Sequence, residues 1–202
     1  MNSELLKPHT AVNYQELFHR AFILISSPAT AWEEIRLEED TRKVFSAFVY
    51  PMIGLCGLAV FLGSLFSHGW GGPEGFRFAM TQCCAMAVSL FGGYFLAAKA
   101  AHWYAINHLK IEMEKPLIMQ LAGYSMVVIF CLRILLALMP DFYIIALLLQ
   151  FYTVYIVWEG SDRLIGISNE KRLNFTLVTS ITLLVAPSLI ETVFNKLTFL
   201  LN

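Results

Sequence analysis

Few residues of this 202-residue chain have the types and spacing that chemistry requires. His102 and His108 lie near Glu112 and Glu114, but their spacing does not match a helical metal motif such as two histidines at i and i+4. The sequence contains no glycine-rich phosphate loop, nucleophile elbow or paired acid. The cysteines stand in apolar runs and are interpreted as packing residues: Cys56, Cys83, Cys84 and Cys131. We therefore predict no enzymatic activity, no metal and no cofactor.

One charged side chain stands where hydrocarbon is expected. Arg133 interrupts the apolar run VVIFCLRILLALMP, and a guanidinium stays charged in proteins. Counting about 1.5 Å per residue from the predicted span ends places Arg133 and Glu191 at nearly the same depth, in two different spans. Two interpretations remain open: an ion pair between them, with Asp141 as a second partner, or an unpaired arginine that reaches the headgroups. Either role is structural, because arginine does not release a proton.

The composition places the chain in a membrane. Hydrophobic residues make up 57% of the sequence and charged residues 14%. A soluble domain has about 45–50% apolar and about 25% charged residues. The net charge of −1 argues against nucleic acid as a partner.

Apolar runs predict an all-α polytopic membrane protein with five transmembrane helices. Four of the five runs have the roughly 20 residues that a bilayer requires, and the fourth run is somewhat shorter. An N-terminal amphipathic, interfacial helical segment over 1–43 precedes the membrane domain over 44–202. The predicted spans cover about 44–66, 78–101, 117–139, 142–158 and 175–194.

Charge near the span ends predicts the orientation. A cytoplasmic N-terminus leaves only Arg77 and Lys196 on the outer side, with Arg133 in the membrane. The other eleven cations are then cytoplasmic: Lys7, Arg20, Arg36, Arg42, Lys43, Lys99, Lys110, Lys115, Arg163, Lys171 and Arg172. The tryptophans agree, because they fall near span ends or in the leader: Trp32, Trp70, Trp103 and Trp158.

The leader, residues 1–43, contains two predicted helices. NYQELFHRAFILISS is amphipathic but too short to span, which predicts a helix on the membrane or against the bundle. Its apolar face holds Leu17, Ala21, Leu24 and Ile25, with Phe18 and Phe22 beside it. SPATAWEEIRLEED begins with a capping serine and a proline suited to the first helical position. This second helix is either a solvated cytoplasmic cap or a docking surface formed by Trp32, Glu33, Glu34 and Ile35.

Small residues and prolines predict how the spans pack. Residues four apart form a small-residue ridge along the second span: Ala85, Ser89, Gly93, Ala97 and Ala101. Such ridges let helix backbones approach closely in lipid. The ridge packs either inside the bundle, which we favour, or against a second copy of the chain. Pro51 and Pro187 each remove a backbone donor and are interpreted as helix kinks.

Four segments together resemble a known family. In order they are SSPATAWEEI, FVYPMIGLCGLAVFLGSLF, LAGYSMVV followed by LMPDF, and LLLQFYTVYIVWEGSDRLIGI. This order is similar to the bacterial branch of the Yip family, the Ypt/Rab-interacting integral membrane proteins. The eukaryotic Asp-Leu-x-Gly-Pro signature of the first span is absent, and FVYPMIG stands in its place. The resemblance implies five spans, a cytoplasmic N-terminus and a bacterial inner-membrane location, with no catalytic residues.

These patterns favour a non-enzymatic membrane scaffold or adaptor. Its contacts would be the bilayer, a protein partner on the cytoplasmic side and, if the ridge faces outward, a second copy. The leader and the inner loops would bind the partner or organise the bilayer. The leader residues concerned are Trp32, Glu33, Glu34, Glu38, Glu39 and Asp40. The alternative is a small-solute transporter or channel subunit, which a water-filled path lined by Gln82, Gln120 and Gln150 would favour.

Overall fold

The computed structural model describes residues 13–38, 40–41, 43–68 and 72–201. Within these ranges every regular element is a helix, and five are long and apolar enough to span a membrane. The predicted fold class, an all-α membrane protein with an N-terminal helical segment, is confirmed. Several residues of the sequence predictions lie outside the described ranges: residues 1–12, which include Lys7, and Glu39, Arg42 and Trp70.

The first two spans are long and nearly uninterrupted. A π-helix, η1 (Phe45–Val49), leads into α3 (Tyr50–His68), and α4 covers Pro73–Asn107. The π-helix lies directly before Pro51, whose ring nitrogen cannot donate to the carbonyl of Ala47 four residues earlier. The N–H of Tyr50 bonds instead to the carbonyl of Phe45, five residues earlier. Wider turns of this kind are one way a helix absorbs a local break.

The third and fourth spans are each divided, which the sequence did not predict. The third consists of α5 (Lys115–Ser125) and α6 (Val127–Leu138), separated at Met126. The fourth consists of a 3₁₀ turn, η2 (Pro140–Phe142), then α7 (Tyr143–Leu149) and α8 (Tyr152–Arg163). The fifth span is the single helix α9 (Asn169–Leu201), which continues through Pro187.

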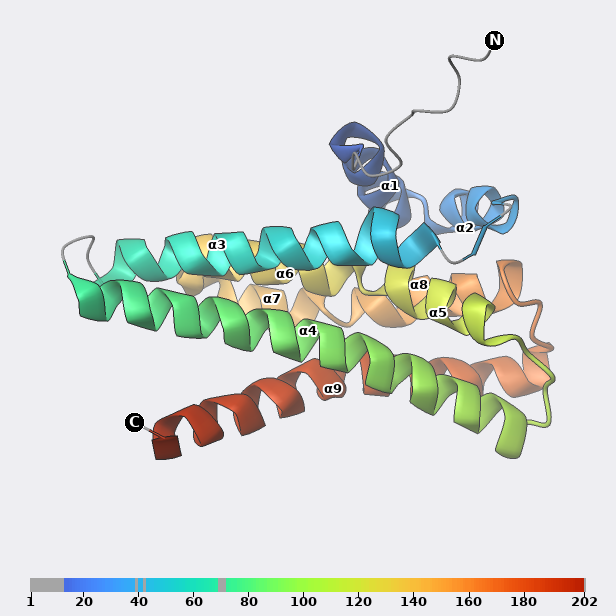
Figure 1. Ribbon diagram of the computed structural model, residues 1–202. Helices are drawn as coiled ribbons and strands as arrows, with labels where there is room; N and C mark the ends of the chain where they lie inside the picture. Colours follow the sequence, from blue (N-terminus) through green and yellow to red (C-terminus); the bar gives the residue numbers. More distant parts are fainter. Residues whose placement is uncertain (1–12, 39, 42, 69–71, 202) are drawn as a thin grey trace, which may run out of the picture.

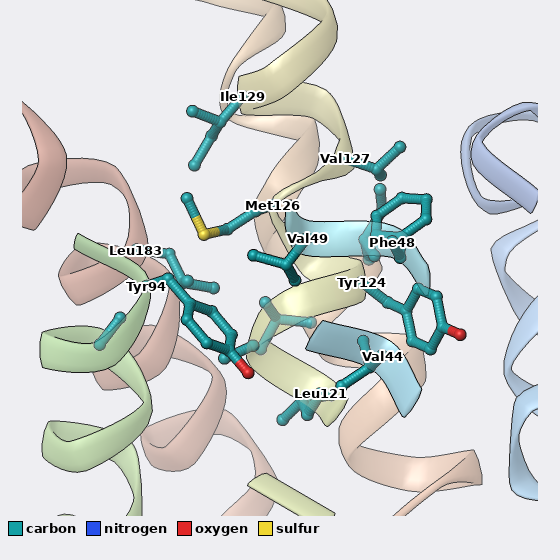
Figure 2. Packing of buried hydrophobic residues seen from close by; sticks show 14 of the residues in the cluster. Val44, Phe48, Val49, Tyr94, Leu121, Tyr124, Met126, Val127, Ile129 and Leu183 are labelled. Atoms are coloured by element: carbon teal, nitrogen blue, oxygen red, sulfur yellow. The ribbon is translucent and has the colours of Figure 1, made fainter. Parts of the chain in front are cut away.

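Helix packing concentrates at one end of the bundle. The helix α4 packs along both α9 and α3, while α3 also contacts α6 and α8 contacts α9. Large side chains are fully buried in the core, among them Trp32, Phe48, Tyr94, Phe130 and Phe175. Figure 2 shows residues of η1, α4, α5 and α9 meeting there, including Phe48, Tyr94, Leu121, Tyr124 and Leu183. By contrast, Ala146 is the one buried residue of α7, so most of that segment faces outward.

Two short helices precede the spans and pack on the same end. They are α1 (Tyr14–Ser26) and α2 (Pro28–Arg36), and Figure 1 shows them on one side of the bundle, beside the start of α3. The side chain of Asn13 caps α1 by accepting from the Glu16 N–H, and Pro28 occupies the first turn of α2. We call this the leader end of the bundle. It includes the C-termini of α4 and α8 and the N-termini of α5 and α9.

Candidate functional site

The leader is anchored to the bundle by Trp32. Its indole Nε1 donates a hydrogen bond of 2.9 Å to the carbonyl oxygen of Ile156 in α8. Its ring meets Tyr124 of α5 edge-on, with centroids 6.2 Å apart. Gly160 lets α8 come this close, because a Cβ there would lie 2.7 Å from the Trp32 ring and 2.5 Å from Leu121. Trp32 therefore occupies a slot between α5 and α8 that a larger residue at position 160 would fill.

Glu38, just after α2, interacts with three donor side chains, one from α1 and two from α5. Arg20 of α1 approaches its Oε1 to 2.9 Å. Gln120 of α5 donates to its Oε2 at 3.1 Å, and the Tyr124 hydroxyl donates to the same oxygen at 3.3 Å. The Glu38 side chain is 24% exposed, so bulk water screens these interactions only partly. A half-buried carboxylate thus connects both leader helices to the third span.

A second group of charges surrounds a surface hollow of about 420 Å³. Arg163 donates through Nε to Glu159 at 2.9 Å and also pairs with Glu33 of α2. The hollow is lined by Glu33, Arg36, Leu37, Asp162 and Arg163. Leu37 is 79% exposed, so an apolar side chain projects among charged neighbours.

The base of α9 is held to the same end by two cations. Arg172 pairs with Asp162 at 3.1 Å, and its guanidinium lies 4.0 Å from the centre of the Trp158 ring. Lys171 donates to the carbonyl oxygen of Leu109, beyond α4, at 2.7 Å. The ends of α4, α8 and α9 are therefore fixed relative to one another where the leader docks.

The structure changes the predicted docking surface. Trp32 and Ile35 are buried against the bundle, so they are not available to a partner as the sequence suggested. They turn inward because α2 has a single apolar edge, and burying that edge on α8 removes it from water. Glu33 and Glu34 remain exposed, paired with Arg163 and Arg20 respectively.

The structure brings Arg133 and Glu191 together. Arg133 Nη1 in α6 lies 2.9 Å from Glu191 Oε2 in α9, and both side chains are about a quarter exposed. Their lone position inside otherwise apolar segments is the signal that sequence reasoning used. Asp141, the second candidate partner, lies in the turn beyond α6.

Comparison with known families decides the ancestry of the chain. The family model described as Yip1 domain matches residues 22–190. The chain belongs to the Yip family. Comparisons with curated proteins and with solved structures gave no match. The Yip match begins inside α1 and ends one residue before Glu191, so it includes Arg133 but not its partner.

In this Yip protein the small-residue ridge lies inside the bundle. All five residues are buried: Ala85, Ser89, Gly93, Ala97 and Ala101. A Cβ at Gly93 would lie 2.5 Å from the Pro187 ring, so α4 and α9 approach closely at this point. Gly93 of the ridge and the predicted kink residue Pro187 are thus neighbours in space.

The histidines take part in local contacts. His102 Nε2 lies 3.2 Å from the carbonyl oxygen of Met113, and His108 stacks on Tyr104. Across the described parts of the chain, no group of three or more His, Cys, Asp or Glu residues could hold a metal ion.

Sequence reasoning missed the role of Gln120 and Tyr124. The sequence suggested Gln120 as one lining residue of a water-filled path, whereas its side chain donates to a carboxylate of the leader. The one indication in the sequence was that Gln120 is a neutral polar residue of the third span, at a depth near the end of the span where the leader lies. Gln120 and Tyr124 lie 82 and 86 residues after Glu38, and a separation of this length forms no sequence motif.

Proposed function

We propose that this Yip-family protein is a non-enzymatic scaffold or adaptor that binds a protein partner at the leader end. The partner would contact the hollow between α2 and the end of α8. The membrane domain would hold this surface at the bilayer and present it in a fixed orientation.

The exposure of Leu37 supports this proposal most directly. At 79% exposure, Leu37 loses contact with water if a partner covers it, which favours association. It stands among Glu33, Arg36, Asp162 and Arg163. An apolar centre within a polar rim is the usual composition of a protein interface.

We further propose that the leader end faces the cytoplasm of a bacterium, with the C-terminus outside. The excess of Lys and Arg near the leader end supports this orientation, because cytoplasmic segments are enriched in these residues. The partner would then be a cytoplasmic or membrane protein of the same cell.

Point variants test the proposal better than deletion of the leader. Deleting α1 and α2 would remove Trp32 and Ile35 from the core and disturb the whole bundle. We would purify the full chain from its native membrane in mild detergent and quantify every co-purifying protein. Leu37→Ser should reduce a stoichiometric partner by about tenfold, which corresponds to about 1.4 kcal/mol.

Ile106→Ser is the matched control, because Ile106 is an exposed apolar residue near the same end of α4. It should leave the partner bound. Equal recovery of every co-purifying protein from the wild type and Leu37→Ser would refute the proposed surface. Solute flux through liposomes of the purified protein would instead support the transporter alternative.

A further inference from the structure

The helix α1 has three distinct faces. Leu17, Ala21 and Leu24 are buried against the protein. A second, polar face carries Glu16 and His19, which are exposed. The third face is apolar and also exposed. It comprises Tyr14 at 54%, Phe18 at 54%, Phe22 at 69% and Ile25 at 37% exposure.

The spacing of this third group makes it a continuous stripe. Steps of four, four and three residues place the side chains on one side of a helix. We call Tyr14, Phe18, Phe22 and Ile25 the α1 stripe. The stripe contains no charged residue, although charged side chains lie elsewhere on α1. Water alone would be an unfavourable environment for four such neighbours.

The α1 stripe continues a surface that belongs to a membrane span. The hydroxyl of Tyr152 donates to the carbonyl oxygen of Ile25 at 2.9 Å. Next to Tyr152 in the chain, Phe151 is 59% exposed, and Tyr155 one turn later is 44% exposed. These residues lie in the candidate span Pro140–Arg163, and we expect the outward side chains of a span to meet lipid. The C-terminal end of the stripe therefore adjoins a lipid-contacting surface.

The depth of this contact fits a helix in the membrane interface. Tyr152 lies seven residues before Glu159 in α8, which is about 10 Å at 1.5 Å per residue. Glu159 pairs with Arg163 and marks the charged end of that helix. Interfacial amphipathic helices bury their apolar face about 5–10 Å into the headgroup and acyl boundary. The end of α1 at Ile25 is thus at the level where lipid begins.

We propose that the α1 stripe inserts into the lipid of the leaflet at the leader end. One face of α1 then binds the bundle, the adjoining face binds lipid, and the polar face with Glu16 and His19 remains in water. The occupant is lipid rather than another protein, because the stripe is continuous with the span surface around Phe151 and Tyr155. This inference concerns α1 and does not depend on the hollow near Leu37.

Site-directed spin labelling in liposomes tests the insertion. The four cysteines would first be replaced by alanine, and single cysteines introduced by Phe18→Cys, Phe22→Cys, Glu16→Cys or His19→Cys. Each labelled protein would be reconstituted into phosphatidylethanolamine and phosphatidylglycerol vesicles. Collision rates would be measured with oxygen, which concentrates in lipid, and with a water-soluble nickel chelate. Positions 16 and 19 are the matched controls, because both residues are exposed on the polar face of the same helix.

Labels at 18 and 22 should collide several-fold more with oxygen than with the chelate, and labels at 16 and 19 should show the reverse. Equal access of all four labels to the chelate would overturn the proposal. Protection of 18 and 22 from both reagents would also overturn it. Dipolar broadening between labels would then show that a second copy covers the stripe. Without such broadening, another part of the same chain would cover it.

A second measurement keeps the four native cysteines, because their replacement could prevent folding. Lipids with a diazirine near the glycerol end of an acyl chain would be photolysed in vesicles that contain the wild-type protein. Adducts should appear at Phe22 and Ile25 and be absent from Glu16 and His19. Phe18→Ser combined with Phe22→Ser should lower the yield on α1 several-fold and leave the yield on Phe151 unchanged. If Phe151 carries adducts and the residues of the α1 stripe carry none, the proposed insertion is wrong.

Discussion

The indole nitrogen of Trp32 lies 2.9 Å from the carbonyl oxygen of Ile156, and this hydrogen bond fixes the leader on the fourth span. The bond joins residues 124 positions apart. It lies within a buried contact that also includes Tyr124 and Gly160. The leader is therefore part of the folded core, and changes at this contact should alter its docking measurably.

Trp32→Phe should loosen the leader while most of the packing remains. The phenyl ring still fills much of the slot, but the Ile156 carbonyl loses a donor, which costs about 1 kcal/mol. Trypsin cleavage after Arg36 should become faster under native conditions, because cleavage follows the population of the open form. Trp103→Phe is the control, since Trp103 is 57% exposed and should leave the cleavage rate unchanged.

Glu38→Gln should weaken the same docking through charge. The amide keeps the shape of the side chain but loses the ion pair with Arg20 and weakens the bonds from Gln120 and Tyr124. Hydrogen bonds to charged groups contribute about 1.5–3 kcal/mol. The thermal unfolding midpoint in detergent should therefore fall. Glu112→Gln, which neutralises an exposed carboxylate, should not lower it, and an equal fall in both variants would contradict the assignment.

Gly160→Ala and Gly54→Ala should have opposite effects. Alanine normally favours a helix over glycine by about 1 kcal/mol. At position 160 the new methyl group would meet Leu121 at 2.5 Å and Trp32 at 2.7 Å, and overpacking of this kind costs about 1–3 kcal/mol. At position 54 nothing lies within 4 Å of the added Cβ. Unfolding midpoints should thus fall for Gly160→Ala alone, and stabilisation by both changes would show that the slot has room.

Charge reversal tests the pair between α6 and α9. Arg133→Glu and Glu191→Arg should each destabilise the bundle by about 1.5–3 kcal/mol, because each removes the charged hydrogen bond of 2.9 Å and brings two like charges together. The double variant restores opposite charges and should recover most of that loss. Stability would be compared by reversible unfolding in detergent mixtures. A double variant no more stable than either single one would mean that the pair contributes nothing.

The spans and the leader helices could be predicted because their signals are local. Continuous apolar runs of adequate length gave the spans, and Ser27 with Pro28 indicated the start of α2. Arg133 and Glu191 could be matched because two lone opposite charges at one depth leave few alternatives. The breaks at Met126 and between α7 and α8 had no such signal, since neither break contains glycine or proline.

The arrangement of the leader could not be predicted because amphipathicity does not identify the opposing surface. The sequence placed Leu17, Ala21, Leu24 and Ile25 on one apolar face, but the structure divides that face. Leu17, Ala21 and Leu24 turn toward the protein, and Ile25 joins the exposed phenylalanines. Likewise, a tryptophan on the edge of α2 is compatible with water, lipid, a partner or the bundle. The leader packs on the bundle through contacts between residues more than 80 positions apart, which the sequence does not reveal.

The distance along the chain between Trp32 and its acceptor also imposes an order of assembly. A ribosome that adds about 5–20 residues per second needs roughly 6–25 s to make the 124 residues between them. Throughout that interval the part of α8 that contains Ile156 has not been made, so Trp32 cannot yet form its hydrogen bond. The helices α1 and α2 are therefore synthesised well before the surface on which they dock, and their docking requires that the fourth span is in place.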